Sequence, residues 1–140
     1  MKVVDASVAL KWFKQEGGSD EARTLLLRES LIAPELILAE VLNAAWKAAR
    51  LGLMTSLQAD IVCAELPLCV ARLEHLAPLA TSAARAARQL DHPVYDCFYL
   101  ALADREGVPL VTADTRLATK VAGTCWSDLV LPLQPSAISR

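Results

Sequence analysis

The stretch VVDASVAL, from Val3 to Leu10, places a single carboxylate at the end of a short apolar run. Its first two valines are β-branched residues typical of a buried strand, and Ser7 is a candidate cap for a helix beginning SVALKWF. The stretch therefore predicts a strand that leads at once into a helix, with Asp5 at the junction. An aspartate at that point either ends the strand and caps the helix or belongs to a functional site, and Asp5 alone does not distinguish the two.

Beyond this stretch, short apolar runs alternate with helical patterns along the chain. Further strands are predicted at residues 31–33, 70–73, 108–112 and 129–131, and helices are predicted to begin at Ser19 and to span 34–51, 55–66, 78–90, 93–107 and 115–121. Strands that alternate with helices favour an α/β fold with a central parallel sheet. We expect one domain over residues 1–133, followed by a C-terminal tail at 134–140.

The composition narrows the class of protein. The chain has 140 residues, 54% of them hydrophobic, but no apolar run approaches the roughly 18 residues of a membrane span. Because Met1-Lys2 leads directly into a strand rather than into a signal peptide, we expect a cytoplasmic protein without a membrane anchor. The surplus of apolar residues suggests a surface that a second copy or a partner covers.

Cysteine and histidine usage argues against a zinc site. The four cysteines lack any metal-like pairing and are expected to be free thiols, and the two histidines show no HExxH spacing. The formal net charge of −2 argues against an extended basic surface for duplex DNA. The chemistry of this chain must therefore depend largely on carboxylates, hydroxyls and a few cations.

Four carboxylates occupy unusual places in the predicted fold. In open parallel sheets, sites form outside the carboxyl ends of the strands, and Asp5 and Asp114 follow two predicted strands. Asp96 lies in the first turn of the apolar helix in HPVYDCFYLALA, and Glu40 interrupts the apolar helix LILAEVLNAAW. Asn43 follows Glu40 by three residues, so both lie on one helical face.

Carboxylates gathered at one place would repel one another and would titrate as a coupled set. A hard divalent cation, Mg²⁺ or Mn²⁺, resolves this repulsion because it prefers oxygen ligands. Such an ion also polarises a phosphoryl group and neutralises the charge that develops on it. If the four acids converge, they predict a metal site, with one or two ions, that acts on a phosphate ester.

Each of these residues also has a purely structural interpretation. Asp5 and Asp114 are suitable helix caps, and Asp96 is a favourable charge near the positive end of a helix dipole. Ser7 and Thr112 are suitable capping or strand-end hydroxyls. Glu40 has the weakest structural explanation, because its neighbours in sequence are apolar.

Four segments in order, VVDASVAL, LAEVLN, YDCFYLALA and LVTAD, resemble the PIN-domain ribonucleases, in particular the VapC-like toxins of toxin–antitoxin pairs. The resemblance extends over essentially the whole chain. It implies a three-layer α/β/α sandwich with a central, mostly parallel sheet of about five strands. It also implies a Mg²⁺- or Mn²⁺-dependent endoribonuclease, a hydrolase acting on ester bonds, that leaves 5′-phosphate and 3′-hydroxyl ends.

The resemblance implies roles for individual residues. Asp5 and Asp96 would be central metal ligands, Glu40 would hold the metal or its water, and Asp114 would ligate through water or a second metal. Beside them we expect three polar side chains, Ser7, Thr112 and Asn43. RNA contacts are expected from cations near the rim of the site, the candidates being Lys11, Lys47, Arg50, Arg85, Arg88, Arg116 and Lys120.

The resemblance also implies partners, namely an RNA substrate, a second copy in a homodimer, and a cognate antitoxin over a groove formed by the helices around residues 30–66. Two alternatives stay open. One is a non-catalytic PIN-fold module for RNA binding or oligomerisation. The other is a phosphoaspartate-type phosphatase, although Ser7 stands where the haloacid-dehalogenase type needs a second aspartate.

Overall fold

The structure is a computed structural model that describes residues 1–134, so the predicted tail lies, apart from Gln134, outside the described residues. Five strands alternate with helices along this part of the chain, as the sequence predicts. In chain order the elements are β1 (Lys2–Val4), α1 (Ala6–Phe13), α2 (Ser19–Arg28), β2 (Leu31–Pro34), α3 (Leu36–Arg50), α4 (Ser56–Cys69), β3 (Arg72–Glu74), η1 (Ala77–Leu79), α5 (Ala80–Leu90), α6 (Val94–Glu106), β4 (Leu110–Thr112), α7 (Thr115–Val121), η2 (Ser127–Leu129) and β5 (Val130–Pro132).

The five strands form one parallel sheet in the order β3-β2-β1-β4-β5. Strand β1 is central. Strands β2 and β3, which follow it in the chain, lie on one side of it, and β4 and β5 lie on the other side. The strand order therefore reverses between β1 and β4, and a crevice forms at such a point outside the carboxyl ends of the two strands. Asp5 follows β1 directly, and Thr112 is the last residue of β4.

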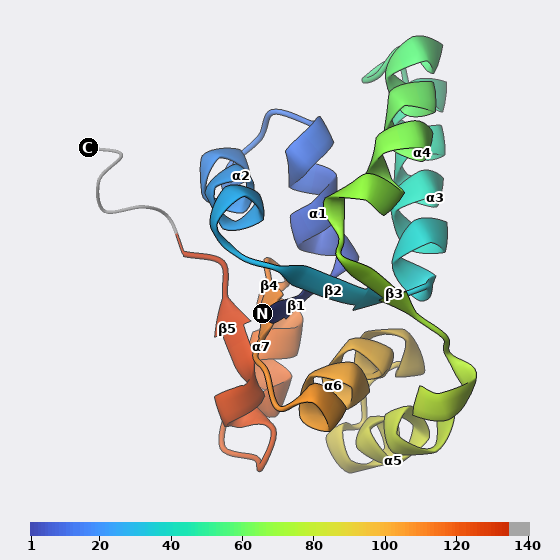
Figure 1. Ribbon diagram of the computed structural model, residues 1–140. Helices are drawn as coiled ribbons and strands as arrows, with labels where there is room; N and C mark the ends of the chain where they lie inside the picture. Colours follow the sequence, from blue (N-terminus) through green and yellow to red (C-terminus); the bar gives the residue numbers. More distant parts are fainter. Residues whose placement is uncertain (135–140) are drawn as a thin grey trace.

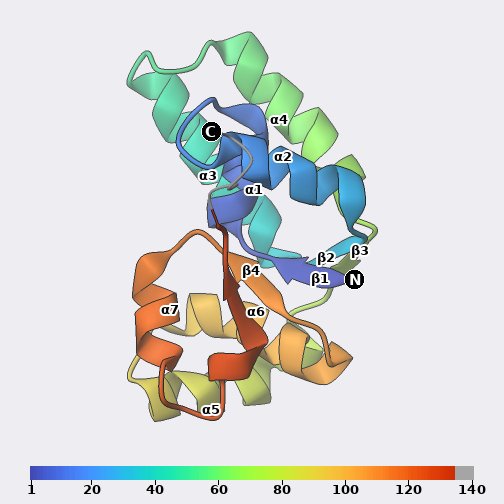
Figure 2. The same cartoon turned by 90° about the vertical axis from the view of Figure 1, so that its left-hand side faces the viewer.

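Helices cover both faces of the sheet and give the expected α/β/α sandwich (Figure 1). In both views α1 to α4 lie on one face, and α5, α6 and α7 lie on the other (Figures 1 and 2). The strand residues Val3 and Val4 are fully buried because they are covered on both sides. Helix α6 is apolar around most of its circumference, and Leu100 and Leu102 are completely buried, as expected for a helix that packs on the centre of the sheet.

Several element boundaries differ from the sequence prediction. Strand β4 covers Leu110–Thr112 rather than 108–112, and α3 begins at Leu36 rather than at residue 34. Helix α4 begins with a capping box formed by Thr55 and Gln58, and it continues through Pro67 to Cys69 instead of ending at residue 66. A proline removes one hydrogen bond of the helix, and the burial of Leu66 against the core offsets that loss. Strand β3 lies at Arg72–Glu74 rather than at 70–73.

The helix caps also correct the prediction. The cap of α1 is Asp5, whose carboxylate accepts a hydrogen bond from the backbone N–H of Val8, whereas Ser7 lies inside the helix. Helix α2 begins at Ser19, and the residue before it is Gly18, whose φ of 88° is a conformation that glycine adopts without strain. The hydroxyl of Ser19 donates a hydrogen bond to the backbone carbonyl of Lys14 and accepts one from the backbone N–H of Glu16, both in the loop before α2.

Candidate functional site

The crevice between β1 and β4 contains all four carboxylates that the sequence singled out. A cavity of about 220 Å³ lies there, lined by Asp5, Ala6, Ser7, Glu40, Asp96, Asp114 and Arg116. The four acids come from four different parts of the chain: the β1–α1 junction, the middle of α3, the first turn of α6 and the β4–α7 junction. The fold thus brings together residues up to 109 positions apart in sequence.

Asp5 is the most buried of the four acids, with only 4% of its surface exposed. One carboxylate oxygen accepts hydrogen bonds from the hydroxyl of Ser7, at 2.5 Å, and from a backbone N–H, while the other accepts from the hydroxyl of Thr112. Burial raises the pKa of Asp5 to about 6, although these hydrogen bonds favour the charged form, and the nearby charge of Asp96 adds to the rise. Asp5 is therefore both a helix cap and a buried carboxylate whose hydrogen-bond donors are all neutral.

Ser7 and Thr112 fix the two loops of the crevice to each other. The hydroxyl oxygen of Ser7 accepts a hydrogen bond from the backbone N–H of Ala113, at 2.9 Å, and the hydroxyl oxygen of Thr112 accepts one from the N–H of Asp114, at 3.0 Å. The hydroxyls of Ser7 and Thr112 both donate to Asp5. The prediction that these two hydroxyls lie beside the carboxylates is therefore consistent with the geometry.

Glu40 projects from α3 and is half-buried. Its carboxylate accepts a hydrogen bond from the hydroxyl of Tyr99, a residue of α6 that is almost fully buried. Burial raises the pKa of Glu40, and the charge of Asp96 acts in the same direction. Burial and the charge of Glu40 also raise the pKa of Tyr99, so Tyr99 is a neutral donor. Sequence reasoning did not single out Tyr99, although it follows Asp96 by three residues and so shares its helical face.

Asp96 has a partner that sequence reasoning also missed. The Nε2 atom of His92 lies 2.6 Å from a carboxylate oxygen of Asp96, and only 10% of the His92 side chain is exposed. The spacing of four residues around the start of α6 is the signal that identifies this pair.

Asp114 caps α7, which was its structural interpretation, and at the same time lines the cavity. One of its carboxylate oxygens accepts a hydrogen bond from the backbone N–H of Arg116 at 2.9 Å and another from the guanidinium of the same residue at 3.4 Å. The two interpretations of Asp114 are therefore compatible.

The remaining predicted residues lie outside the cavity. Asn43 is exposed on α3 and is not among the described residues that line it. Lys11 bonds to the backbone carbonyl of Gly17, and Lys47 is exposed. Arg85 lines a separate hollow near η2. Arg116, in contrast, is among the residues that line the carboxylate cavity.

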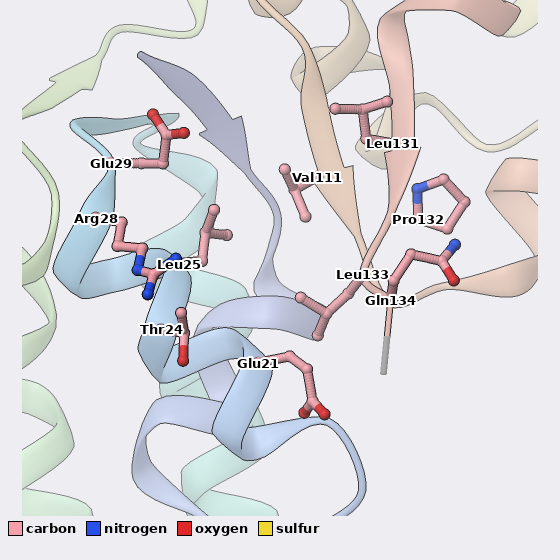
Figure 3. A pocket seen from close by; sticks show the side chains of 10 residues that line it. All are labelled: Glu21, Thr24, Leu25, Arg28, Glu29, Val111, Leu131, Pro132, Leu133 and Gln134. Carbon is pink, nitrogen blue, oxygen red and sulfur yellow. The ribbon is translucent and has the colours of Figure 1, made fainter. Parts of the chain in front are cut away.

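A mostly apolar hollow of about 350 Å³ lies between α2 and β5 (Figure 3). Its apolar lining includes Leu25, Val111, Leu131 and Leu133, with Arg28 at its rim. None of the four candidate acids is among the described residues that line this hollow. The carboxylate cavity, and not this hollow, is therefore the candidate catalytic site.

The oxygen-only donor set of the carboxylate cavity fits a hydrated Mg²⁺ or Mn²⁺ ion. No three Asp, Glu, His or Cys side chains of residues 1–134 stand close enough together to hold one ion. In this arrangement Asp96 bonds to His92, and Glu40 accepts a hydrogen bond from Tyr99. Mg²⁺ needs only one or two direct carboxylate ligands and keeps several waters. The buried charge of Asp5, which has only neutral donors around it, would gain a counter-charge from such an ion.

Tyr99→Phe tests how firmly Glu40 is held. The change leaves the half-buried carboxylate without its donor, and we expect the free energy of unfolding to fall by about 1–2 kcal/mol in urea denaturation. Tyr95→Phe is the matched control, because Tyr95 is exposed on the same helix and its change should stay within about 0.5 kcal/mol. Equal losses in both variants would show that the bond from Tyr99 to Glu40 contributes nothing specific.

Comparisons with known proteins identify relatives of this chain in sequence and in fold. The PIN domain family model matches residues 2–123. The chain is 33% identical over 121 residues to Ribonuclease VapC3 of Pyrobaculum aerophilum, covering 84% of this chain and 92% of that protein. It is 34% identical over 131 residues to Ribonuclease VapC1 of Mycobacterium tuberculosis, covering 91% and 96%.

Solved structures share the fold. PAE2754 from Pyrobaculum aerophilum superposes with a TM-score of 0.69 at 26% identity, covering 94% of this chain and 83% of that one. A chain of a toxin-antitoxin complex from Klebsiella pneumoniae superposes with a TM-score of 0.67 at 14% identity, covering 97% of this chain and 100% of that one. At 14% identity the second likeness concerns the fold alone.

Proposed function

The chain belongs to the PIN-domain family, and on that premise we propose that it is a VapC-type toxin, a divalent-metal-dependent endoribonuclease paired with an antitoxin. The observation that supports this most directly is the convergence of Asp5, Glu40, Asp96 and Asp114 on one cavity at the point where the strand order reverses. A cavity lined by four acids repels phosphate unless a cation is present, and with a cation it attracts phosphate.

The proposed site holds one or two Mg²⁺ or Mn²⁺ ions. Asp5 and Asp96 would be the direct ligands, and Asp114 would contact an ion through water or hold a second one. When bound, the ion supplies Lewis acidity toward the phosphoryl oxygen and lowers the pKa of water. Asp5 is fixed for this role by the hydroxyls of Ser7 and Thr112, and Asp96 is held by His92.

The chain's own residues then have separate tasks in phosphodiester hydrolysis. Glu40 shares its carboxylate with Tyr99 through one oxygen, which leaves the second oxygen to accept a proton from the attacking water. Arg116, at the rim of the cavity, contacts the phosphate from the side opposite to α3. The bond to the departing 3′ oxygen breaks as the water oxygen bonds to phosphorus. The departing oxygen takes a proton from solvent, so the products carry 5′-phosphate and 3′-hydroxyl ends.

Cleavage of defined RNAs tests the proposal. The wild-type protein, freed from any co-purified partner, should cut single-stranded RNA in Mg²⁺ or Mn²⁺ and should stop when EDTA is added. The ends are identified by their response to phosphatase and kinase. Cutting that persists in EDTA, or products with 3′-phosphate ends, would contradict the proposed chemistry.

The geometry does not favour the phosphatase alternative. A phosphoaspartate nucleophile of the haloacid-dehalogenase type works with a second aspartate two residues later in the sequence. Ser7, which takes the place of the second acid, donates to Asp5 itself. The non-catalytic alternative gives no reason to keep four acids around one cavity, and the cleavage assay above separates it from the nuclease.

The proposed antitoxin partner has a suitable surface on the α3–α4 hairpin. Large apolar side chains are exposed along α3, α4 and the turn between them: Trp46, Leu51, Leu53, Leu57 and Ile61. Figure 1 shows this hairpin projecting beyond the sheet. Glu40 lies on the same helix α3, so a partner bound along it would reach the carboxylate cavity. We also propose a homodimer, because a second copy of the chain could cover exposed apolar surface of this kind.

We also propose that residues 1–133 act as one domain, consistent with the family match to residues 2–123. Within residues 1–134, every helix is too short or too polar to span a bilayer. We place the proposed activity in the cytoplasm, where RNA substrates are found.

A further inference from the structure

A second hollow, of about 570 Å³, opens beside the carboxylate cavity. Asp96 and Arg116 line both, so the two spaces are neighbours. The other residues that line the second hollow come from α7 and from the loop that leads into α6: Asp91, His92, Pro93, Thr115, Thr119 and Lys120. Figure 2 shows α7 on the same side of the sheet as α5 and α6.

The α7 wall of this hollow presents cations and hydroxyls. Thr115, Arg116, Thr119 and Lys120 follow one another at helical spacing and so form one face of α7. The side chain of Arg116 is 88% exposed, and Lys120 is exposed with no carboxylate within 4.0 Å of its ammonium among the described residues. Because the two cations are four residues apart, they lie about 6 Å apart along the helix axis.

The opposite wall has a different character. Asp91 ends α5 with a φ of 49°, and its carboxylate repels phosphate. The ring of His92 is occupied by its bond to Asp96, and Pro93 adds an apolar surface next to it. The hollow is therefore asymmetric, with its cationic side on α7 and its acidic and apolar side on the loop before α6.

We propose that this hollow binds the nucleotide next to the scissile phosphate of a single-stranded RNA, with its phosphate on the α7 wall and its base and sugar toward Pro93. The inference rests on the proposed ribonuclease function and specifies the path of the substrate. Arg116, shared by the two cavities, contacts the phosphates on both sides of the nucleotide, and Lys120 contacts the outer one. The proposed RNA contacts involve only a few cations on one helix, so they are compatible with a chain whose net charge is −2.

The affinity of the protein for a fluorescent single-stranded RNA tests whether the α7 wall of the second hollow contacts the phosphates. The experiment uses, in Mg²⁺, the Glu40→Gln protein, which lacks the proposed proton acceptor but keeps the proposed metal ligands Asp5 and Asp96, and follows anisotropy at several salt concentrations. Adding Lys120→Ala should weaken binding about threefold to tenfold and should lower the slope of log K against log salt by about 0.7, the value for one phosphate contact on a single strand. Cleavage by the otherwise wild-type Lys120→Ala protein should show a raised KM and an unchanged kcat.

Two further variants sharpen the test. Arg28→Ala removes an exposed charge beside the hollow between α2 and β5 (Figure 3) and should leave both affinity and slope unchanged. Asp91→Asn removes the repelling charge while keeping a residue that tolerates positive φ, and it should tighten binding.

The outcomes separate this inference from the proposed function. If the wild type cleaves RNA but Lys120→Ala behaves like Arg28→Ala, or if Asp91→Asn binds no more tightly, the second hollow is not on the path of the substrate. Failure of the Glu40→Gln protein to bind RNA at all also overturns the inference. If the wild type cleaves no RNA, the proposed function fails, whatever the binding variants show.

Discussion

Asp5→Asn is expected to lower RNA cleavage about 10³-fold and, in the absence of metal, to make the folded protein more stable at neutral pH. The loss of activity follows because the asparagine amide is a poor ligand for a hard cation, and a metal that stabilises phosphoryl charge contributes several kcal/mol to the reaction. The gain in stability follows because asparagine removes a charge that the fold buries against neutral donors only.

The size and pH dependence of the stability gain follow from the pKa of Asp5. Burial raises the pKa of this carboxyl from 3.8 to about 6, so its ionisation costs the folded state about 3 kcal/mol relative to the unfolded chain. Because the folded state binds this proton more tightly, the contribution of Asp5 to stability is most favourable below pH 4 and is lost as the pH rises through 6. Asp5→Asn should therefore gain about 1–3 kcal/mol at pH 7.5 and little or nothing at pH 4.

Urea denaturation in EDTA at the two pH values measures this difference. Asparagine caps a helix about as well as aspartate, so the cap of α1 survives the change. Asp60→Asn, an exposed acid on α4, is the matched control and should change stability by less than about 0.5 kcal/mol at either pH. A loss of stability at pH 7.5 in Asp5→Asn would mean that the carboxylate is retained for the structure rather than for a metal.

Much of the fold is predictable from local sequence. The alternation of short apolar runs with helical patterns identified five strands and the α/β class, and it placed the start of α4 within one residue. The boundaries were less accurate where tertiary packing decides them. Helix α4 continues through Pro67 because burial of Leu66 outweighs the missing hydrogen bond, and this burial is a property of the assembled core.

The candidate site was predictable only in part, for a physical reason. The four acids were identified because a carboxylate at a strand end or in an apolar helix is costly unless something uses it. Their partners Tyr99 and His92 are not costly in this way, since tyrosine and histidine are ordinary residues in a core helix and near a helix start. Only their helical spacing from Asp96 connects them with the site. The position of Arg116 and Lys120 on one wall of a hollow depends on how α7 packs beside α6, which no local pattern encodes.

Addition of Mn²⁺ is expected to raise the melting temperature of the wild type by about 10 °C at a free ion concentration near 100 times its dissociation constant. An ion that binds only the folded state stabilises it by about 2.7 kcal/mol at that concentration. For a domain of this size each kcal/mol corresponds to about 4 °C. The ion also supplies the counter-charge that the buried Asp5 lacks, so binding and folding are coupled at this residue.

The Mn²⁺-dependent shift in the melting temperature of three variants tests whether the ion binds in the carboxylate cavity. Asp5→Asn and Asp96→Asn should each lose most of the Mn²⁺-dependent shift, because each removes one of the two proposed direct ligands. Asp60→Asn should keep it in full, since its carboxylate is exposed on α4, away from the crevice between β1 and β4. A shift that is the same in all four proteins would show that Mn²⁺ binds elsewhere, because a cavity that holds the ion through Asp5 and Asp96 has to respond to the loss of either.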